Sequence, residues 1–451
     1  MTPAARIQAV IDILGTLEHT DQPADRHLRD WGRMHRFAGS KDRAAVGERV
    51  FAILRHRASL AWRMGGDAPR ALAIASLLKE GAGADAIAAL FGGEGYGPAA
   101  LDDAERAAIA LPPDGEPPSH ARGEYPRFLE VELGRAFGNR LLDEMSAMQA
   151  RAPVDLRVNT LKADRDEVLA ALRAGGLEAG PSRYSAFGIR LDSGQGAALA
   201  RGKLYQSGAF EFQDEAAQIA SLLCCARPGM RVLDLAAGAG GKSLALAALM
   251  RNEGEIVATD IRFDALVELE RRAVRAGVTT IRDLPLPREA GERAGVRGWQ
   301  TQSIIVPPPH PDPLPLEGGG ENNGFDVVLI DAPCSGSGTW RRQPELRWRL
   351  MQERLAELMS TQDALLAQAA TRVKPGGRLV YATCSILPCE NQDRIAAFLD
   401  SHKVFSLVPA ADIWRESMGT GTPPGMGQFF RATPLSTGTD GFFTAILARD
   451  A

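Results

Sequence analysis

The sequence predicts an α/β protein in which a doubly wound parallel sheet follows a separate helical domain. From about residue 208, apolar β-branched runs alternate with amphipathic helical patterns, as expected for a parallel sheet covered on both faces. Residues 1–120 instead carry apolar side chains at three- and four-residue spacing, which is typical of helices. The length of 451 residues exceeds one compact core, so we expect two or three domains.

The composition argues for a protein that stays in the cytoplasm. Apolar residues make up 45% and charged residues 24% of the chain. No apolar run is long enough for a membrane span, and the opening MTPAARIQAV lacks the apolar centre of a signal peptide. Five cysteines without a CxxC pair, and only seven histidines, argue against a disulfide framework or a zinc site. Cys224 and Cys225 lie in an apolar helical pattern and are predicted to be core residues.

Three regions are predicted along the chain. Residues 1–120 form a helical domain, and the Pro/Gly-rich stretch 111–126 is a linker. Residues 125–207 form a mixed segment of helices and a strand-like VDLRVNTLK run. Residues 208–451 form the parallel-sheet domain, whose strands we place at 230–237, 255–261, 325–333 and 376–385. The Pro-, Gly- and charge-rich residues 282–324 interrupt this rhythm and are predicted to be an insertion without regular structure.

A glycine-rich turn joins the first strand of this domain to its helix. In VLDLAAGAGGKS, residues 232–243, the glycines let the backbone approach a ligand, and the amides that open the helix face it. The glycine spacing before Lys242 does not match a phosphate-binding Walker loop. Asp260 ends the next strand, where a carboxylate can accept hydrogen bonds from a ribose diol. These features favour S-adenosylmethionine as cofactor, with a dinucleotide as the main alternative.

One acid and two cysteines follow later strands of the same sheet. Asp331, Cys334 and Cys384 fall at the carboxyl ends of strands, where a doubly wound fold places its chemistry. Carbon 5 of cytosine is a poor nucleophile, and a thiolate that adds to carbon 6 activates it. A carboxyl group can hold the base and stabilise the charge that develops on it, and a second thiol can assist product release. One acid with two thiols therefore fits methylation of cytosine.

The motifs DAPCSGSG, YATCSILPCEN and DLAAGAGGKS resemble those of the RNA (cytosine-5) methyltransferase family, the RsmB/Sun group. The resemblance runs from about residue 125 to the C-terminal DGFFTAILAR and includes LRVNTLK and FQDEAAQ. It implies a Rossmann-like S-adenosylmethionine-dependent methyltransferase domain. It also implies that Cys384 attacks the base, that Cys334 aids product release and that Asp331 orients the cytosine. Cys389 stands where the family often has another residue, and we interpret it as incidental.

The same resemblance implies a set of donor-binding residues. The set comprises Ala236, Ala237, Gly238, Ala239, Gly240, Gly241, Lys242, Asp260, Asp283 and Asp331. The family's turn usually reads Cys-Ala-Ala-Pro-Gly-Gly-Lys, so AAGAGGK here lacks the proline. Asp283 is the best candidate for a third acid near the adenine, although it lies closer to the preceding helix than the family spacing places it.

Two further stretches indicate an RNA partner. SKDRAAVGERVFAILRHR, residues 40–57, resembles part of a NusB-like RNA-binding domain, and residues 1–70 carry 12 Lys/Arg against 8 Asp/Glu. The alternative is a helical domain that only packs on the catalytic one. WRRQPELRWRLMQER, residues 340–354, combines arginines with tryptophans, a mixture that binds phosphates and stacks on bases, although most charged runs are solvated surfaces.

The sequence therefore predicts a monomeric, metal-free enzyme that methylates carbon 5 of a cytosine in RNA, with small-subunit ribosomal RNA as the expected substrate. Transfer RNA is the alternative substrate, because the chemistry is the same. A non-catalytic RNA-binding assembly factor is the alternative from another class, and the intact acid and cysteines argue against it. The sequence does not indicate which cytosine is modified.

Overall fold

The computed structural model describes residues 1–192, 194–285 and 324–451. The chain forms two compact units, the first from residues 1–150 and 339–352 and the second from residues 151–338 and 353–451. Each unit has its own buried apolar clusters. Of the helices that the structure describes, none combines the length and the apolar character needed to cross a bilayer.

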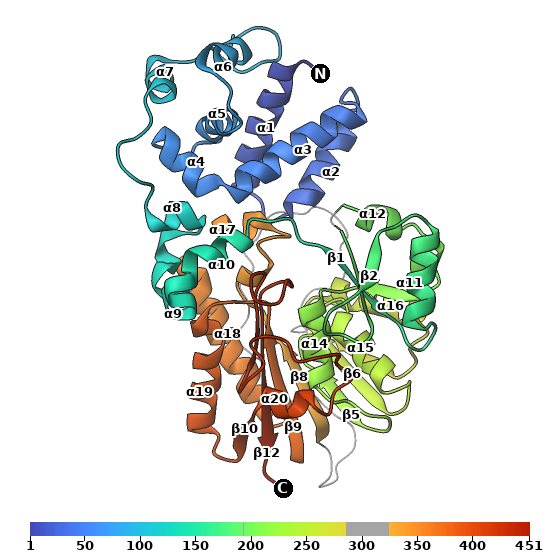
Figure 1. The fold of residues 1–451 in the computed structure, drawn as a ribbon. Coiled ribbons are helices and arrows are strands. Elements are labelled where there is room, and N and C mark those ends of the chain that lie inside the picture. The colour runs from blue at the N-terminus through green and yellow to red at the C-terminus, as the bar shows by residue number, and fades with distance from the viewer. Residues whose placement is uncertain (193, 286–323) are drawn as a thin grey trace, which may run out of the picture. The chain divides into compact units, whose positions relative to one another are not determined.

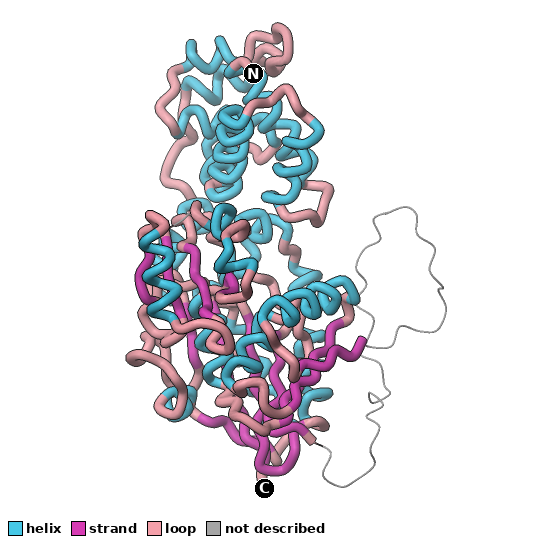
Figure 2. Tube along the Cα trace, turned by 90° about the vertical axis from the view of Figure 1, so that its right-hand side faces the viewer, coloured by secondary structure: helices cyan, strands magenta, loops and turns pink. Residues whose placement is uncertain are grey.

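The first unit, called the helical unit below, contains helices and no strand (Figure 2). Its α-helices are α1 (Pro3–Leu17), α2 (Ala24–Met34), α3 (Ser40–Arg55), α4 (Arg57–Met64), α5 (Pro69–Lys79), α6 (Ala84–Leu90), α7 (Asp103–Ala110), α8 (Ser119–Gly123), α9 (Glu130–Phe137), α10 (Leu141–Ala147) and α17 (Pro344–Arg349). Short 3-10 turns, η1 (Arg127–Leu129) and η2 (Gly138–Arg140), flank α9. Ile13, Val46, Ile53 and Leu72 are buried where α1, α3 and α5 meet.

The helical unit extends to residue 150, beyond the predicted end of the helical domain at 120. Helices α9 and α10 fall in the predicted mixed segment 125–207 but cluster with the helical unit. One reason is the buried carboxylate of Glu124, directly after α8. It accepts hydrogen bonds from the backbone amide of Ala58, at 2.9 Å, and from the hydroxyl of Ser59 at the start of α4. This contact ties the chain around α8 to the core of the unit.

The arginine- and tryptophan-rich stretch 340–354 belongs to the core of the helical unit. Trp340 and Arg347 are fully buried, and the Arg347 guanidinium lies 4.7 Å from the centre of the Trp340 ring. The indole nitrogen of Trp348 donates to the carbonyl of Leu54 at 2.6 Å. The interpretation of this stretch as an exposed RNA-binding surface is therefore wrong for Trp340 and Arg347. These side chains pack α17 against α3 instead.

The second unit, called the sheet unit below, is built around an eight-stranded sheet (Figure 1). The strand order is β10-β12-β9-β8-β5-β6-β7, with β11 paired to β12. The strands are β5 (Arg231–Asp234), β6 (Glu255–Asp260), β7 (Ile281–Pro285), β8 (Phe325–Asp331), β9 (Val373–Thr383), β10 (Phe405–Val408), β11 (Phe430–Ala432) and β12 (Phe442–Arg449). Neighbouring strands from β7 to β9 run parallel, whereas β12 is antiparallel to β9 and β10. The predicted Rossmann-like sheet is confirmed.

Helices cover both faces of this sheet, as the continuous apolar strands require. Helices α14 (Glu215–Leu223), α15 (Gly241–Leu249) and α20 (Ala410–Trp414) bury their apolar side chains in a cluster on one face. Helices α18 (Gln352–Ala370) and α19 (Gln392–Ser401) do so on the other (Figure 1). Cys224 and Cys225 lie in the first cluster, which confirms their prediction as core residues. Helix α16 (Phe263–Ala276) connects β6 to β7.

A second, four-stranded antiparallel sheet belongs to the same unit and has the order β2-β3-β1-β4. Its strands are β1 (Val154–Val158), β2 (Ala179–Pro181), β3 (Gly188–Leu191) and β4 (Phe210–Phe212), accompanied by α11 (Arg165–Ala174), α12 (Gly196–Leu199) and α13 (Lys203–Gln206). Helix α11 packs its apolar side chains on this small sheet. The predicted insertion 282–324 overlaps β7, because residues 282–285 are part of that strand, and residues 286–323 lie outside the described residues.

Candidate active site

The predicted acid and cysteines meet at the carboxyl edge of the main sheet. Strands β8 and β9 are parallel neighbours in which Asp331 lies opposite Ala382. Because both strands end at this level, the loop after β8 that carries Cys334 and the loop after β9 that carries Cys384 leave the sheet side by side. The structure thus brings together three side chains that are separated by as many as 53 residues in the sequence (331 to 384).

The two thiols are in direct contact. The Sγ atoms of Cys334 and Cys384 are 3.4 Å apart, within hydrogen-bonding distance for sulfur. The hydrogen bond to Cys384, together with burial and nearby negative charge, raises the pKa of Cys334 well above its usual range. The raised pKa favours a protonated Cys334, whose S–H can donate to the sulfur of Cys384.

Asp331 is held by a buried lysine. The Nζ atom of Lys242, at the start of α15, lies 2.5 Å from Oδ2 of Asp331 and 5.1 Å from the centre of the Phe442 ring. Burial lowers the pKa of this lysine, but the charge and hydrogen bond of Asp331 outweigh it and leave the pKa above its usual value. Lys242 therefore stays charged near neutral pH. The sequence marked each residue but gave no indication that they pair.

The glycine-rich turn, residues 236–242, lies between β5 and α15 and is called the donor turn below. Gly240 has a φ of +81°, and a Cβ atom there would lie 2.6 Å from Cγ of Leu269, so only glycine fits. The amide of Gly238 donates to Oδ2 of Asp260 at 2.8 Å, which places this buried carboxylate beside the turn. No side chain caps the amino end of α15. Uncapped amides and an adjacent acid fit an adenosine-bearing cofactor.

Two arginines that the sequence did not single out hold the carbonyls of the donor turn. Arg157 of β1 donates from one guanidinium nitrogen to the carbonyl of Gly241 and to Oε1 of Gln213, both at 2.6 Å. Arg272 of α16 donates to the carbonyl of Ala239 at 2.7 Å and is itself paired with Glu211 of β4 at 3.0 Å. The small sheet therefore fixes the backbone of the donor turn.

The remaining predicted site residues lie as follows. Asp283 lies in β7 opposite Ala258 of β6. Asp260, at the end of β6, pairs instead with Pro285, the last residue of β7. The backbone of Asp283 thus lies within the strand and not at its carboxyl end. Cys389 lies in the short turn η4 (Pro388–Glu390), beyond the loop of Cys384.

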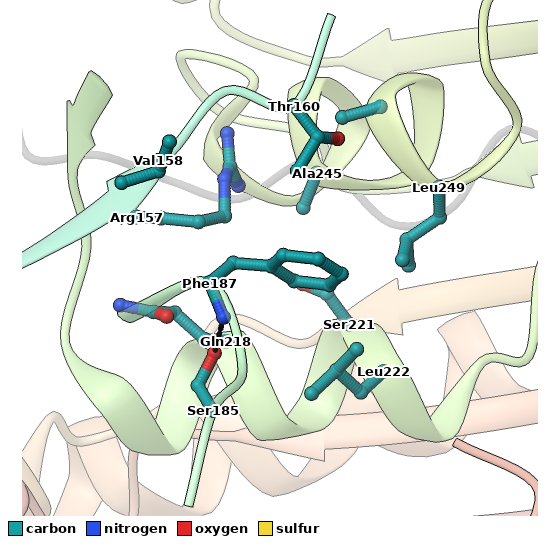
Figure 3. Close-up of a pocket in the computed structure, with 11 residues that line it drawn as sticks. Arg157, Val158, Thr160, Ser185, Phe187, Gln218, Ser221, Leu222, Ala245 and Leu249 are labelled. Carbon is teal, nitrogen blue, oxygen red and sulfur yellow. Dashed lines mark hydrogen bonds between the residues drawn. The ribbon is translucent and has the colours of Figure 1, made fainter. Parts of the chain in front are cut away.

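A crevice lies beside the donor turn but contains none of the predicted site residues. It is lined by the Phe187 ring at its centre, by residues of α14 and α15 such as Ser221 and Leu249, and by Arg157 (Figure 3). The hydroxyl of Ser185 accepts the amide of Phe187 at 3.3 Å in its wall. Because its lining is largely apolar and holds neither a thiol nor an acid, this crevice does not provide the chemistry described above.

Comparisons with known proteins agree with this geometry. A family model described as 16S rRNA methyltransferase RsmB/F matches residues 309–448, and the ferredoxin-like domain of RsmF/B-like methyltransferases matches residues 125–197. The ubiE/COQ5 methyltransferase family matches residues 212–289.

Curated relatives extend these matches over most of the chain. The ribosomal RNA small subunit methyltransferase B of Salmonella newport is 31% identical over 331 residues, which are 73% of this chain and 68% of the relative. The chain belongs to the RsmB/F family. The probable ribosomal RNA small subunit methyltransferase B of Bacillus subtilis is 30% identical over 321 residues. The match covers 71% of the present chain but only 65% of the Bacillus protein. The crystal structure of PH0851 superposes with a TM-score of 0.71 and 25% identity over 99% of both chains.

S-adenosylmethionine is the cofactor of such methyltransferases, and the donor turn of this RsmB/F family member fits it. The turn brings backbone close to the edge of the sheet, and the buried carboxylate of Asp260 lies next to it. The family match over residues 309–448 includes β8, β9 and both thiol loops, so the site and the family point to the same part of the chain.

Proposed function

We propose that this chain is an enzyme that methylates carbon 5 of a cytosine in RNA, through a transient bond between Cys384 and the base. The observation that carries this proposal is the contact of two thiols, 3.4 Å apart, at the sheet edge that also holds Asp331. Small-subunit ribosomal RNA is the proposed substrate, because the relatives above carry that substrate in their names.

The donor turn and its neighbours are proposed to hold the cofactor. When bound, S-adenosylmethionine supplies an electrophilic methyl group. Residues 236–242 would contact it through backbone amides, and Asp260 would accept hydrogen bonds from its ribose. Asp331 lies at the next strand end, between the donor turn and the thiols, where it would contact both cofactor and base. Asp283 is proposed as the acid near the adenine.

The contact between the thiols gives each cysteine a distinct role. We propose that Cys334 donates its S–H across the 3.4 Å contact, which would stabilise a thiolate on Cys384 for attack on carbon 6 of the ring. Once Cys384 is bonded to carbon, it no longer carries negative charge. The pKa of Cys334, which that charge raises, then falls. Cys334 then releases its own proton to solvent more readily, and the resulting thiolate can accept the proton from carbon 5, whose removal lets Cys384 leave.

Asp331 is proposed to hold the base during this attack. A carboxylate can accept a hydrogen bond from the exocyclic amine of cytosine, and the ammonium of Lys242 fixes one of its oxygens at 2.5 Å. This pairing limits the rotation of the carboxylate and leaves its other oxygen for the base. A fixed acceptor is more effective than a mobile one, because less reorganisation is needed as charge develops.

RNA contacts are proposed for both units. Strands β1, β2 and β3 of the small sheet lie in the mixed segment 125–207, for which we predict RNA recognition, and within the ferredoxin-like match, whereas β4 follows that segment. The helical unit, proposed to be NusB-like, exposes Phe37 to 72% beside the exposed cations Arg33, Arg36 and Lys41. Exposed aromatic rings stack on bases, and the cations beside them neutralise phosphates. The target cytosine must be unpaired or extruded before carbon 6 is accessible.

The experiment that tests the proposal separates the roles of the cysteines. Cys384→Ala should abolish methyl transfer to 16S ribosomal RNA, whereas Cys334→Ala should accumulate an RNA-linked protein that survives denaturing electrophoresis. Cys389→Ala is the matched control and should retain activity. An active Cys384→Ala enzyme would overturn the mechanism.

Mapping of 5-methylcytosine in cells with and without the gene tests the substrate. Loss of a single modified position in 16S ribosomal RNA supports the proposal, and loss from transfer RNA instead would replace the substrate while keeping the chemistry. We further propose that the enzyme is a monomer and works in the cytoplasm, where two thiols in contact stay reduced.

A further inference from the structure

Both cysteine loops are attached to one buried carboxylate, that of Glu390 in η4. The side chain is fully buried. Its Oε1 accepts the amide of Ser335 at 2.8 Å, and its Oε2 accepts the hydroxyls of Ser335 and Ser385, each at 2.5 Å. Ser335 directly follows Cys334 and Ser385 directly follows Cys384. A single side chain therefore connects the two residues that come next to the thiols.

A second group ties this carboxylate to the helix behind it. The amide nitrogen of Gln362, on α18, donates to Oε1 of Glu390 and to the carbonyl of Pro333, both at 3.0 Å. The hydroxyl of Tyr381 donates to the backbone carbonyl of Glu390 at 2.7 Å. Glu390 is thus anchored to α18 and β9, two rigid elements, while it holds the two loops.

The next residue, Asn391, acts on the Cys384 loop alone. Its Oδ1 accepts the hydroxyl of Thr383 at 2.6 Å, and its Nδ2 donates to the carbonyl of Ser385 at 2.9 Å. These bonds fix the backbone on either side of Cys384. They do not reach the Cys334 loop. Ser337 of that loop contacts the hydroxyl of Ser385 and the amide of Ile386, both at 3.0 Å, but Glu390 is the side chain bonded to both residues that directly follow the thiols.

Among the described residues, the carboxylate of Glu390 is held by uncharged hydrogen-bond donors and not by a cation. The four side-chain and backbone groups that donate to its carboxylate are hydroxyls and amides, which carry no formal charge. A buried carboxylate is costly unless all its oxygens are hydrogen-bonded. Apolar residues would fill the same space without that cost, but they could not accept bonds from two loops at once.

We propose that Glu390 is a positioning residue that sets the distance between the thiols of Cys334 and Cys384. The catalytic consequence rests on the function proposed above, whereas the geometric one does not. Loss of the carboxylate releases both serines, so the residues next to the thiols are held less closely, although Ser337 and Gly338 still join the loops, and the thiols spend less time in contact. Methyl transfer then slows, while binding of RNA and donor, which Glu390 does not touch, is kept.

Oxidative cross-linking measures the geometric consequence without RNA or cofactor. Diamide takes one hydrogen from each thiol to become a hydrazine, and the two sulfurs form a disulfide. We expect the Cys334–Cys384 bond, located by mass spectrometry, to form at least tenfold more slowly in Glu390→Gln than in the unmodified protein. An unchanged rate in a folded Glu390→Gln protein would overturn the proposal.

Glu215 offers a matched control. It is also fully buried in the sheet unit and accepts backbone amides, from Tyr184 at 2.5 Å and Ser185 at 2.9 Å, but it contacts neither cysteine loop. Glu215→Gln should lower the melting temperature and leave the cross-linking rate within twofold. A similar slowing in both variants would show that general loosening, and not Glu390, sets the distance.

Kinetics and single-serine variants complete the test. In Glu390→Gln, kcat should fall at least tenfold while KM for RNA and for donor changes less than twofold.

Should this variant fail to fold, Ser335→Ala and Ser385→Ala each remove part of the link and should each slow the cross-linking. In a double-mutant cycle their effects should be less than additive, because one carboxylate links both, and strict additivity contradicts the proposal. Absence of methyltransferase activity with intact cross-linking would reject the proposed function alone.

Discussion

At the residue scale, the carboxylate of Asp234, at the end of β5, is fully buried. Its Oδ2 accepts the hydroxyl of Ser243 at 2.6 Å, but its Oδ1 has no hydrogen-bond partner among the residues that the structure describes. Burial raises the pKa of Asp234 to about 7. The hydrogen bond from Ser243 lowers this pKa in part, and the charge of Asp331 raises it further. This acid therefore titrates near physiological pH.

The raised pKa of Asp234 makes the stability of the fold depend on pH. Between pH 4 and 7 the folded protein holds a proton that the unfolded chain has released, so the free energy of unfolding falls as pH rises. At about 1.4 kcal/mol per pKa unit, the total loss is ~4 kcal/mol. Asp234→Asn should remove this slope, so urea unfolding of the two proteins should converge at acidic pH and diverge toward pH 8. Parallel profiles across that range would contradict the assignment.

The residues show why sequence reasoning reached the thiols but missed Glu390. Cys334 and Cys384 follow strand-like runs, and parallel strands that end together bring their ends together. Glu390 lies in a turn, and its link to Ser335 spans 55 residues of sequence. No periodic pattern reports such a contact, so it is found only once the loops are folded.

At the element scale, the donor turn depends on arginines from outside its own β5–α15 unit. Arg157 and Arg272 reach it from β1 and α16, and both hydrogen-bond backbone carbonyls of the turn. A glycine-rich turn has high conformational freedom when unfolded, so external bonds are needed to keep it in one shape. The sequence predicted the turn from its glycines, but the arginines lie 33 residues or more away and carry no motif of their own.

We expect Arg157→Lys to weaken donor binding selectively. One nitrogen of the planar guanidinium donates to both Gly241 and Gln213, and the ammonium of lysine, which is not held in that plane, does not reproduce this geometry. KM for S-adenosylmethionine should rise about tenfold, which corresponds to ~1.4 kcal/mol, with kcat changed less than twofold. Arg231→Lys, at the opposite end of β5, is the control and should leave both constants unchanged. A fall in kcat alone would place Arg157 elsewhere in the mechanism.

The stretch 340–354 shows where a prediction from composition fails. Its arginines and tryptophans matched the composition of an RNA-binding surface, yet Trp340 and Arg347 are buried in the helical unit. Composition reports which interactions a side chain can make and not whether it faces water. The stacking of the Arg347 guanidinium on the Trp340 ring satisfies the same cation–π preference inside the protein.

At the scale of the whole molecule, a net charge of -4 has to be reconciled with an RNA partner. Local charge resolves this, because residues 29–43 carry five Lys/Arg and two Asp, of which Asp42 is already paired with Arg6 at 2.8 Å. Within this region the ring of Trp31 stacks on His35, with centres 4.9 Å apart, and His35 contacts Phe37 edge-on at 5.6 Å. Phe37 is therefore held rigidly although it is exposed.

Replacing Phe37 tests this surface. Phe37→Ala should weaken binding of a twelve-nucleotide single-stranded RNA five- to tenfold in fluorescence anisotropy, because stacking on an aromatic ring contributes ~1–3 kcal/mol per base. The dependence on salt should stay the same, whereas Arg36→Ala should reduce its slope by about 0.7. Tyr96→Ala is the control, since Tyr96 is 90% exposed in the same unit but follows the acidic Glu94. Equal losses for Phe37 and Tyr96 would rule out a specific stacking surface.

The place of β12 in the sheet has a consequence for the synthesis of the protein. This strand is the last along the chain, yet it lies between β9 and β10, and Gly441 just before it donates to the carbonyl of Gly338, whose own amide binds the carbonyl of Cys384. A growing polypeptide cannot complete the sheet until residues 442–449 have left the ribosomal exit tunnel. Until then the bonds from Gly441 through Gly338 to Cys384 are missing, so we expect a partly synthesised chain to hold its two sulfurs out of register.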